Sequence, residues 1–235
     1  LYRVINKILT TYGEDFLENI YPITGRIHPS FLQTGTLTGR VSCKKPNLQN
    51  IPATGEFRHA FTSVNGKILT ADYSGAELRI MADLCNDKTM LDAFNNNEDV
   101  HSKMATIMNG IEVSKHVNSH LRSRQKAINF GLAYGAGAEK FKVLFNNDLE
   151  ETKKVLKKFF TSFPDINKGL KALGEYATTN KNSRTLPPFN RIRWYPELIL
   201  LEKGPVSFKE KLITKAKVGR EGKNHPIQGT SADII

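Results

Sequence analysis

The chain has 235 residues, of which 39% are hydrophobic and 24% charged, an ordinary globular composition that allows one large domain or two moderate ones. Its 34 Lys and Arg residues outnumber its 23 Asp and Glu residues, and the formal net charge of +11 favours a polyanionic partner, most commonly nucleic acid, over a basic surface without a partner. Two cysteines exclude a disulfide framework or zinc cluster and suggest a reducing compartment, and the sequence holds no membrane-spanning apolar run or secretory signal.

The first third of the chain predicts a helix followed by short strands. The chain opens without Met in a helical pattern over residues 1–20, and residues 24–52 mix β-like runs with Gly and Pro, which is typical of strands and ordered loops. The apolar run KILTADY at residues 67–73 predicts a buried strand that ends at Asp72 and Tyr73. After Gly75, AELRIMADLC predicts a helix.

The remainder of the chain is predicted to be mainly helical. Residues 87–181 have helical patterns with breaks near Gly110, Gly135–Gly137 and Pro164, and RTLPPFNRIRWYP predicts a hairpin or extended pair. Residues 202–223 hold seven cations and three acids together with Gly and Pro, so we interpret them as a basic connector. A final helix is expected after NHPIQGT. A sheet region that flanks a helical insertion predicts an α+β fold.

Residues 122–137, RSRQKAINFGLAYGAG, predict a functional stripe on a helix. Two cations and two aromatic residues follow one another at four-residue spacing, opposite an apolar side: Arg122, Lys126, Phe130 and Tyr134. Arg and Lys one turn apart suit neighbouring phosphate oxygens, and an aromatic ring one turn further offers a face to a base or sugar. The stripe therefore favours a nucleoside triphosphate. A basic amphipathic helix that lies on DNA or faces solvent is the alternative.

One carboxylate is a candidate metal ligand. Asp72 would lie at the carboxyl end of a buried strand, which would fix its position. The alternative is an Asp that caps a helix or a turn. His116 and His120 lie four residues apart without an evident third ligand, so we interpret them as surface residues.

Four segments together resemble a known family. TGRVSCKKPNLQNIP, ADYSGAELRIMADL, RSRQKAINFGLAYG and NHPIQGTSADII are similar, in this order, to successive motifs of the polymerase I family of DNA polymerases, family A. The resemblance implies a right-hand polymerase fold, with a partial palm built on a mixed antiparallel sheet and with helical fingers. It divides the chain into the end of the thumb and the palm-entry helices (1–24), the first part of the palm (25–98), the fingers (99–200) and a return to an incomplete palm (201–235).

The resemblance also implies the roles of individual residues. Asp72 and the Tyr73 carbonyl would hold two Mg²⁺ ions, and Asp72 and Lys126 would be catalytic. The residues expected to bind the incoming deoxynucleoside triphosphate are Arg122, Lys126, Phe130, Tyr134, Glu77 and His101. Glu77 and Tyr134 would meet and close the space that a 2′-hydroxyl would occupy. The alternative for His101 is a structural histidine at the start of a helix, with its hydrogen bonds satisfied. The residues expected to contact primer–template DNA are Arg40, Asn47, Gln49, Asn224 and Gln228, although Gln49 is alternatively a residue that orders its own loop.

The implied reaction is attack of a primer 3′-hydroxyl on the α-phosphate of a deoxynucleotide, with release of pyrophosphate. The family's second catalytic Asp belongs to a turn after the last helix, and the sequence stops before it. We therefore expect a monomeric fragment that is inactive alone, from the cytoplasm of a bacterium or phage-infected host, with an organelle as the alternative. A single-subunit RNA polymerase and a non-catalytic DNA-binding module are the rival interpretations. Glu77 and NFGLAYG favour the DNA polymerase.

Overall fold

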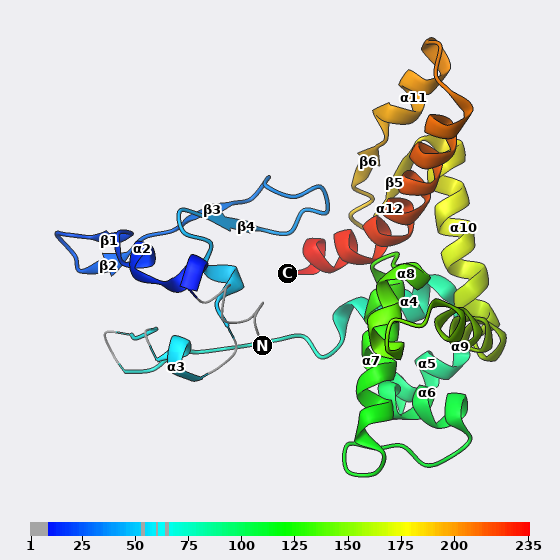
Figure 1. Cartoon of the computed structure of the whole chain (residues 1–235), viewed down its shortest axis with the longest axis horizontal. Coiled ribbons are helices and arrows are strands. Elements are labelled where there is room, and N and C mark those ends of the chain that lie inside the picture. The colour runs from blue at the N-terminus through cyan, green and yellow to red at the C-terminus, as the bar shows by residue number, and fades with distance from the viewer. Residues whose placement is uncertain (1–8, 53–54, 60, 64–65) are drawn as a thin grey trace. The chain divides into compact units, whose positions relative to one another are not determined.

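The structure is a computed structural model that describes residues 9–52, 55–59, 61–63 and 66–235 (Figure 1). Its contacts divide the chain into an N-terminal unit, Leu1–Asp72, and a C-terminal unit, Tyr73–Ile235. Within the described residues, no helix is long and apolar enough to cross a membrane.

The N-terminal unit consists of short helices and two-stranded hairpins. Residues 9–12 are helical, and the other short elements are α2 (Glu14–Leu17), the 3-10 turn η1 (Leu48–Asn50) and α3 (Gly55–Arg58). The antiparallel hairpins pair β1 (Ile20–Tyr21) with β2 (Arg26–Ile27) and β3 (Ser30–Leu32) with β4 (Ser42–Lys44). The strands and loops predicted at residues 24–52 are therefore confirmed. The helix predicted at residues 1–20 is confirmed over 9–17 with a break at Gly13, and its first eight residues lie outside the described residues.

The buried strand predicted at residues 67–73 is wrong. These residues form neither helix nor strand, and Ile68 and Leu69 are 59% and 96% exposed. A strand needs a neighbour that completes its ladder of backbone hydrogen bonds. No strand of the described part of the chain pairs with this segment, so its apolar pattern remains uncovered.

The C-terminal unit is built almost entirely from helices. The first of them are α4 (Ala76–Cys85), α5 (Lys88–Asn95), α6 (Val100–Asn109), α7 (Ser119–Ala133), α8 (Ala138–Phe141), the 3-10 turn η2 (Lys142–Phe145), α9 (Leu149–Ser162) and α10 (Pro164–Asn180). The predicted breaks are confirmed. Gly110 ends α6 in the left-handed conformation, and Pro164 lies in the first turn of α10. Gly135 has φ +71°, and a Cβ there would lie 2.6 Å from the Arg220 carbonyl oxygen.

A hairpin and two helices complete the C-terminal unit. Strands β5 (Asn182–Arg184) and β6 (Ile192–Trp194) pair antiparallel, which confirms the predicted hairpin, and α11 (Pro196–Lys203) and α12 (Phe208–Ile234) follow. The prediction of a basic connector at residues 202–223 is wrong from Phe208 onward, because α12 begins there. The prediction that the final helix starts after NHPIQGT is also wrong, because α12 runs through that segment. The Ser207 side chain accepts from the Glu210 backbone N–H and the Glu210 side chain accepts from the Ser207 backbone N–H, a capping box that begins α12.

The main core lies between the helices of the C-terminal unit. Figure 1 shows α10 and α12 running side by side. Buried apolar side chains from α4 to α10 and from α12 form one cluster that includes Leu78, Met81, Met104, Ile128, Phe159, Ile166 and Ile227. Each such burial contributes about 1.5–3 kcal/mol relative to an exposed side chain. The fold is thus mostly helical with small antiparallel sheets, and the described residues form no larger mixed sheet of the kind expected for the palm.

Candidate nucleotide and nucleic-acid site

Helix α7 carries the predicted stripe on the side opposite its most buried residues, although Phe130 also packs partly against the main core. Ile128 and Leu132 are 2% and 5% exposed and pack into the main core. On the other side Lys126 is exposed, Arg122 and Phe130 are half-buried, and Tyr134, the C-cap residue, is 40% exposed. The structure therefore presents cations and aromatic rings along one accessible line, in the order that the sequence predicts.

Arg122, the first cation of the stripe, forms an ion pair with the residue that caps α6. Nε of Arg122 donates to Oδ2 of Asp99 at 2.6 Å, and Oδ1 of Asp99 caps α6 by accepting from the backbone N–H of His101. Burial alone would raise the pKa of Asp99, but the hydrogen bond and charge of Arg122 hold that pKa below its ordinary value. Because the bond uses Nε, it orients a guanidinium fork that carries two further nitrogens.

Three rings lie in sequence beside the cations. The ring centroids of His101 and Phe130 are 5.6 Å apart, and those of Phe130 and Tyr134 are 6.2 Å apart. Both distances are typical of packed aromatic pairs. The half-buried Phe130 ring therefore packs against two neighbouring rings, which restrict its movement.

His101 is buried between α6 and α7. It is 8% exposed, and its Nδ1 lies 3.2 Å from Nδ2 of Asn129. Burial lowers the pKa of His101 to about 4, assisted by the charges of Arg122 and Lys126 and opposed by Asp99. The ring is therefore neutral at pH 7. A contact with phosphate stays a prediction.

The candidate metal and sugar-gate residues lie at the start of α4. Asp72 and Tyr73 are exposed, Gly75 caps the helix at φ +65°, and Glu77 is 5% exposed in the first turn. Helix α4 packs against α7, but a contact of Glu77 with Tyr134 stays a prediction. Among the described residues, no three His, Cys, Asp or Glu side chains gather to hold a metal ion. His116 and His120 are exposed, in agreement with their interpretation as surface residues.

The candidate DNA contacts fall in both units. In the N-terminal unit Arg40 is exposed, Asn47 accepts from the Gln49 backbone N–H, and Gln49 donates its Nε2 to the Val41 carbonyl at 3.1 Å. These bonds order the loop, which is the alternative role given to Gln49.

In the C-terminal unit Asn224 and Gln228 are half-buried on α12, and Nδ2 of Asn224 lies 3.5 Å from the Ala133 carbonyl oxygen. Asn224 also lines a hollow of about 560 Å³ beside the C-terminal end of α7. Residues lining this hollow include Tyr134, Lys140, Lys153 and Arg220. Glu139 and Glu221 also line it, so its charges are nearly balanced.

Comparison with known proteins decides the family. A model of DNA polymerase family A matches residues 1–235. The chain belongs to DNA polymerase family A. DNA polymerase I of Caldicellulosiruptor bescii is 35% identical over 239 aligned residues, and that of Pseudomonas aeruginosa is 37% identical, each over 100% of this chain. The family A chain spans only 27% and 25% of the lengths of these relatives.

A solved structure shows the same similarity in three dimensions. The POL domain of Pol1 from M. smegmatis, in complex with DNA primer-template and dNTP, has a TM-score of 0.81 and 34% sequence identity to the family A chain. The match covers 99% of this chain and 40% of that one. The family resemblance drawn from four sequence motifs is therefore confirmed.

Sequence reasoning missed three polar residues of the family A chain that support the stripe. Asp99 holds Arg122, and Gln125 and Asn129 lie buried behind the stripe, at 4% and 0% exposure. Gln125 contacts Asn129, and Asn129 contacts His101. The spacing of Gln125 and Asn129 by four residues was the available signal. This spacing indicates a buried polar pair only when α6 is known to cover that side of α7.

Proposed function

We propose that this chain is the nucleotide-binding part of a template-directed DNA polymerase, which adds deoxynucleotides to a primer 3′-end and releases pyrophosphate. The observation that carries the proposal is the outward stripe of α7. It presents Arg122, Lys126, Phe130 and Tyr134 in the order in which a triphosphate, a sugar and a base would meet them. The relative from M. smegmatis, whose structure contains primer-template and dNTP, supports this assignment. In this proposal residues 99–200 are the fingers.

The two cations bind and neutralise the triphosphate. Arg122 is already oriented by Asp99, so less conformational freedom is lost when its fork meets phosphate oxygens. Lys126 is exposed one turn further along α7 and supplies a compact charge for the phosphate negative charge that develops during transfer. Phe130, which packs against His101 and Tyr134, supports the sugar and base.

The described residues do not complete a metal site. Family A membership implies two Mg²⁺ ions, which would activate the primer hydroxyl and stabilise the leaving oxygens. Asp72 and the carbonyl of Tyr73 are candidate oxygen ligands, and hard cations such as Mg²⁺ prefer oxygen. One carboxylate does not meet the needs of two ions, and no acidic cluster joins Asp72 in the described part of the chain.

The primer–template is proposed to contact Arg40 and Asn47 of the N-terminal unit, and Asn224 and Gln228 of α12. Arg, Asn and Gln donate hydrogen bonds to the acceptors that every base pair presents in the minor groove. Such contacts test the shape of a base pair without reading its sequence. Gln49 is the weakest member of the set, because its amide already bonds to the Val41 carbonyl.

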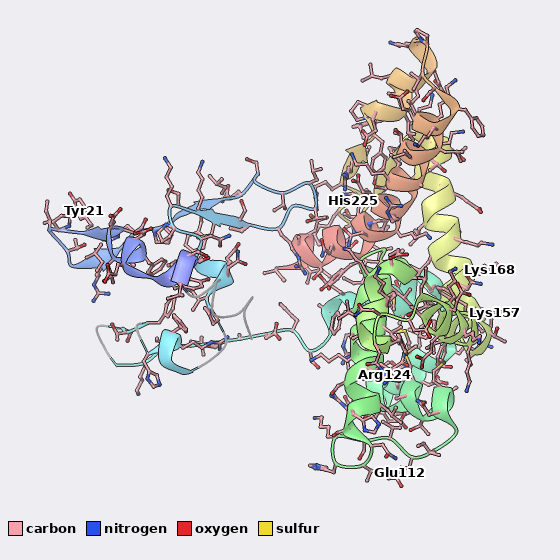
Figure 2. All side chains as sticks on the ribbon, in the orientation of Figure 1. Tyr21, Glu112, Arg124, Lys157, Lys168 and His225 are labelled. Carbon is pink, nitrogen blue, oxygen red and sulfur yellow. The ribbon has the colours of Figure 1, made fainter. Side chains whose placement is uncertain are left out.

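Primer extension tests the proposed function in a polymerase that carries this segment. Lys126→Ala should lower the rate of nucleotide incorporation by on the order of 10²–10³, as for loss of one preorganised electrostatic donor, and should change primer–template affinity little. Lys157→Ala on α9, an exposed lysine labelled in Figure 2, is the matched control and should leave the rate unchanged. An unchanged incorporation rate in Lys126→Ala would show that Lys126 does not act on the phosphates. If the wild-type polymerase bound DNA but did not extend the primer, the segment would be a DNA-binding module.

A further inference from the structure

Three buried polar side chains form a relay between α6 and α7. Nε2 of Gln125 donates to Oδ1 of Asn129 at 2.6 Å, and Nδ2 of Asn129 lies 3.2 Å from Nδ1 of His101. All three residues are at most 8% exposed. A buried polar group that loses its partner costs about 1–3 kcal/mol, so the relay favours one arrangement of its hydrogen bonds.

A further contact of Asn129 sets the direction of that arrangement. Its Nδ2 also lies 3.2 Å from Sδ of Met104, and a thioether sulfur accepts hydrogen bonds but donates none. If the amide were reversed, its carbonyl oxygen would face the Met104 sulfur with no hydrogen between them. The Asn129 carbonyl therefore accepts from Gln125, and its two N–H groups donate to Met104 and His101.

The direction of the relay determines the tautomer of His101. Because Nδ1 accepts a hydrogen bond from Asn129, the single proton of the neutral ring lies on Nε2. Burial, assisted by the charges of Arg122 and Lys126 and opposed by Asp99, lowers the pKa of His101 to about 4 and keeps the ring neutral at pH 7. His101 thus carries one hydrogen-bond donor, Nε2–H, next to the phosphate-binding cations of the stripe.

We propose that Asn129 is a positioning residue for nucleotide binding: held by its contacts with Met104 and Gln125, it keeps His101 in the Nε2–H tautomer, which donates to a phosphate oxygen of the incoming nucleotide. The ligand in this inference rests on the proposed function. The tautomer rests only on the contacts of the relay. Asn129 and Gln125 themselves touch neither nucleotide nor metal in this scheme.

Nitrogen NMR of the full chain, labelled with ¹⁵N-histidine, tests the relay. Long-range ¹H–¹⁵N correlations distinguish the two neutral tautomers, and a His101→Gln variant assigns the signals. We expect Nε2–H in the wild type at pH 7, with an Nε2 shift on addition of dATP. Gln125→Met removes the donor to the buried Asn129 carbonyl, so the Asn129 amide should turn, populate the Nδ1–H tautomer of His101 and weaken dATP binding by about 3- to 10-fold.

Ser123→Ala is the matched control, because the Ser123 hydroxyl donates to the Ser119 carbonyl on the exposed side of the same helix, at 3.0 Å. It should change neither the tautomer nor dATP affinity. An Nδ1–H tautomer in the wild type would overturn the relay whether or not Gln125→Met folds, as would an unchanged tautomer in a folded Gln125→Met chain that binds dATP. Failure of the wild-type chain to bind dATP would instead overturn the proposed function, and with it the ligand assigned to His101.

Discussion

The hydroxyl of Ser183 on β5 lies 2.9 Å from Nδ1 of His225 on α12, and both side chains are buried, at 1% and 0% exposure. The Ser183 hydroxyl also lies 2.9 Å from the hydroxyl of Tyr195, so one small polar cluster joins the hairpin to the long helix. Nε2 of His225 meets no hydrogen-bond partner in the described part of the chain. A proton on Nε2 therefore finds no hydrogen-bond acceptor there. Figure 2 shows His225 on α12.

Acid should destabilise the chain through this cluster. Burial lowers the pKa of His225 to about 4, assisted by Arg191 and Arg193 and opposed by Asp233. A histidine in the unfolded chain titrates near 6.5, so between pH 6.5 and 4 the unfolded state binds a proton that the folded state does not. The free energy of unfolding should fall by about 3 kcal/mol for His225 across that window, and His101, whose pKa is also lowered to about 4, adds a similar amount.

Urea unfolding at a series of pH values checks this expectation. Replacing His225 by Met should make the loss of stability between pH 6.5 and 4 shallower. His120→Asn, at an exposed position, should leave the slope as in the wild type. Equal slopes for all three chains would show that His225 does not carry the acid sensitivity.

The 235-residue chain should bind primer–template without extending it. Its net charge of +11 provides Lys and Arg to displace counterions from DNA, so affinity should fall steeply with salt. Extension is not expected, because the described residues gather no metal-binding cluster around Asp72. Binding titrations from 50 to about 200 mM salt, run beside a primer-extension assay, measure both properties. Salt-insensitive binding or measurable extension by the purified chain would contradict this expectation.

Sugar selection should depend on two residues in different ways. A merely apolar pocket rejects an added hydroxyl only by roughly 10², so the buried Glu77 and the hydroxyl of Tyr134 are proposed to close the space of the 2′-hydroxyl. In a polymerase that carries this segment, Glu77→Ala should raise ribonucleotide incorporation. Phe130→Tyr adds a hydroxyl to the ring that supports the sugar, and should raise dideoxynucleotide incorporation while ribonucleotide rejection stays largely intact.

Competition among deoxy-, ribo- and dideoxynucleotides for one primer measures both effects. Each variant serves as the control for the other, since each should change the use of one sugar. A Glu77→Ala enzyme that still refuses ribonucleotides as before would rule out the gate.

The helix formed by residues 208–223 was not predicted from the sequence. Their Gly residues suggest a connector, yet in the structure Gly222 lies where α12 packs against α10, and a Cβ there would lie 2.1 Å from Cβ of Ala177. A glycine that weakens an isolated helix here allows two helices to approach closely. The capping box of Ser207 and Glu210 was visible in the sequence and marked the true start of α12.

The stripe on α7 could be predicted from the sequence, but the contacts with α6 that hold its side chains could not. Local periodicity places Arg122, Lys126, Phe130 and Tyr134 on one side of a helix whatever packs behind it. The ion pair with Asp99 and the buried amide of Asn129 depend on α6 lying against α7, a contact that no local pattern encodes. The prediction of a buried strand at residues 67–73 failed for the same reason, because burial of a strand depends on a neighbouring element elsewhere in the fold.

Titration of the chain with dATP tests the α7 nucleotide site most directly. Loss of one charge-assisted contact costs about 1.5–3 kcal/mol, so Lys126→Ala should weaken dATP binding by about 10- to 100-fold. Lys157→Ala keeps the same net charge as Lys126→Ala and removes an exposed lysine of α9, so it should bind dATP like the wild type. Equal affinities of Lys126→Ala and Lys157→Ala for dATP would contradict a triphosphate site on helix α7.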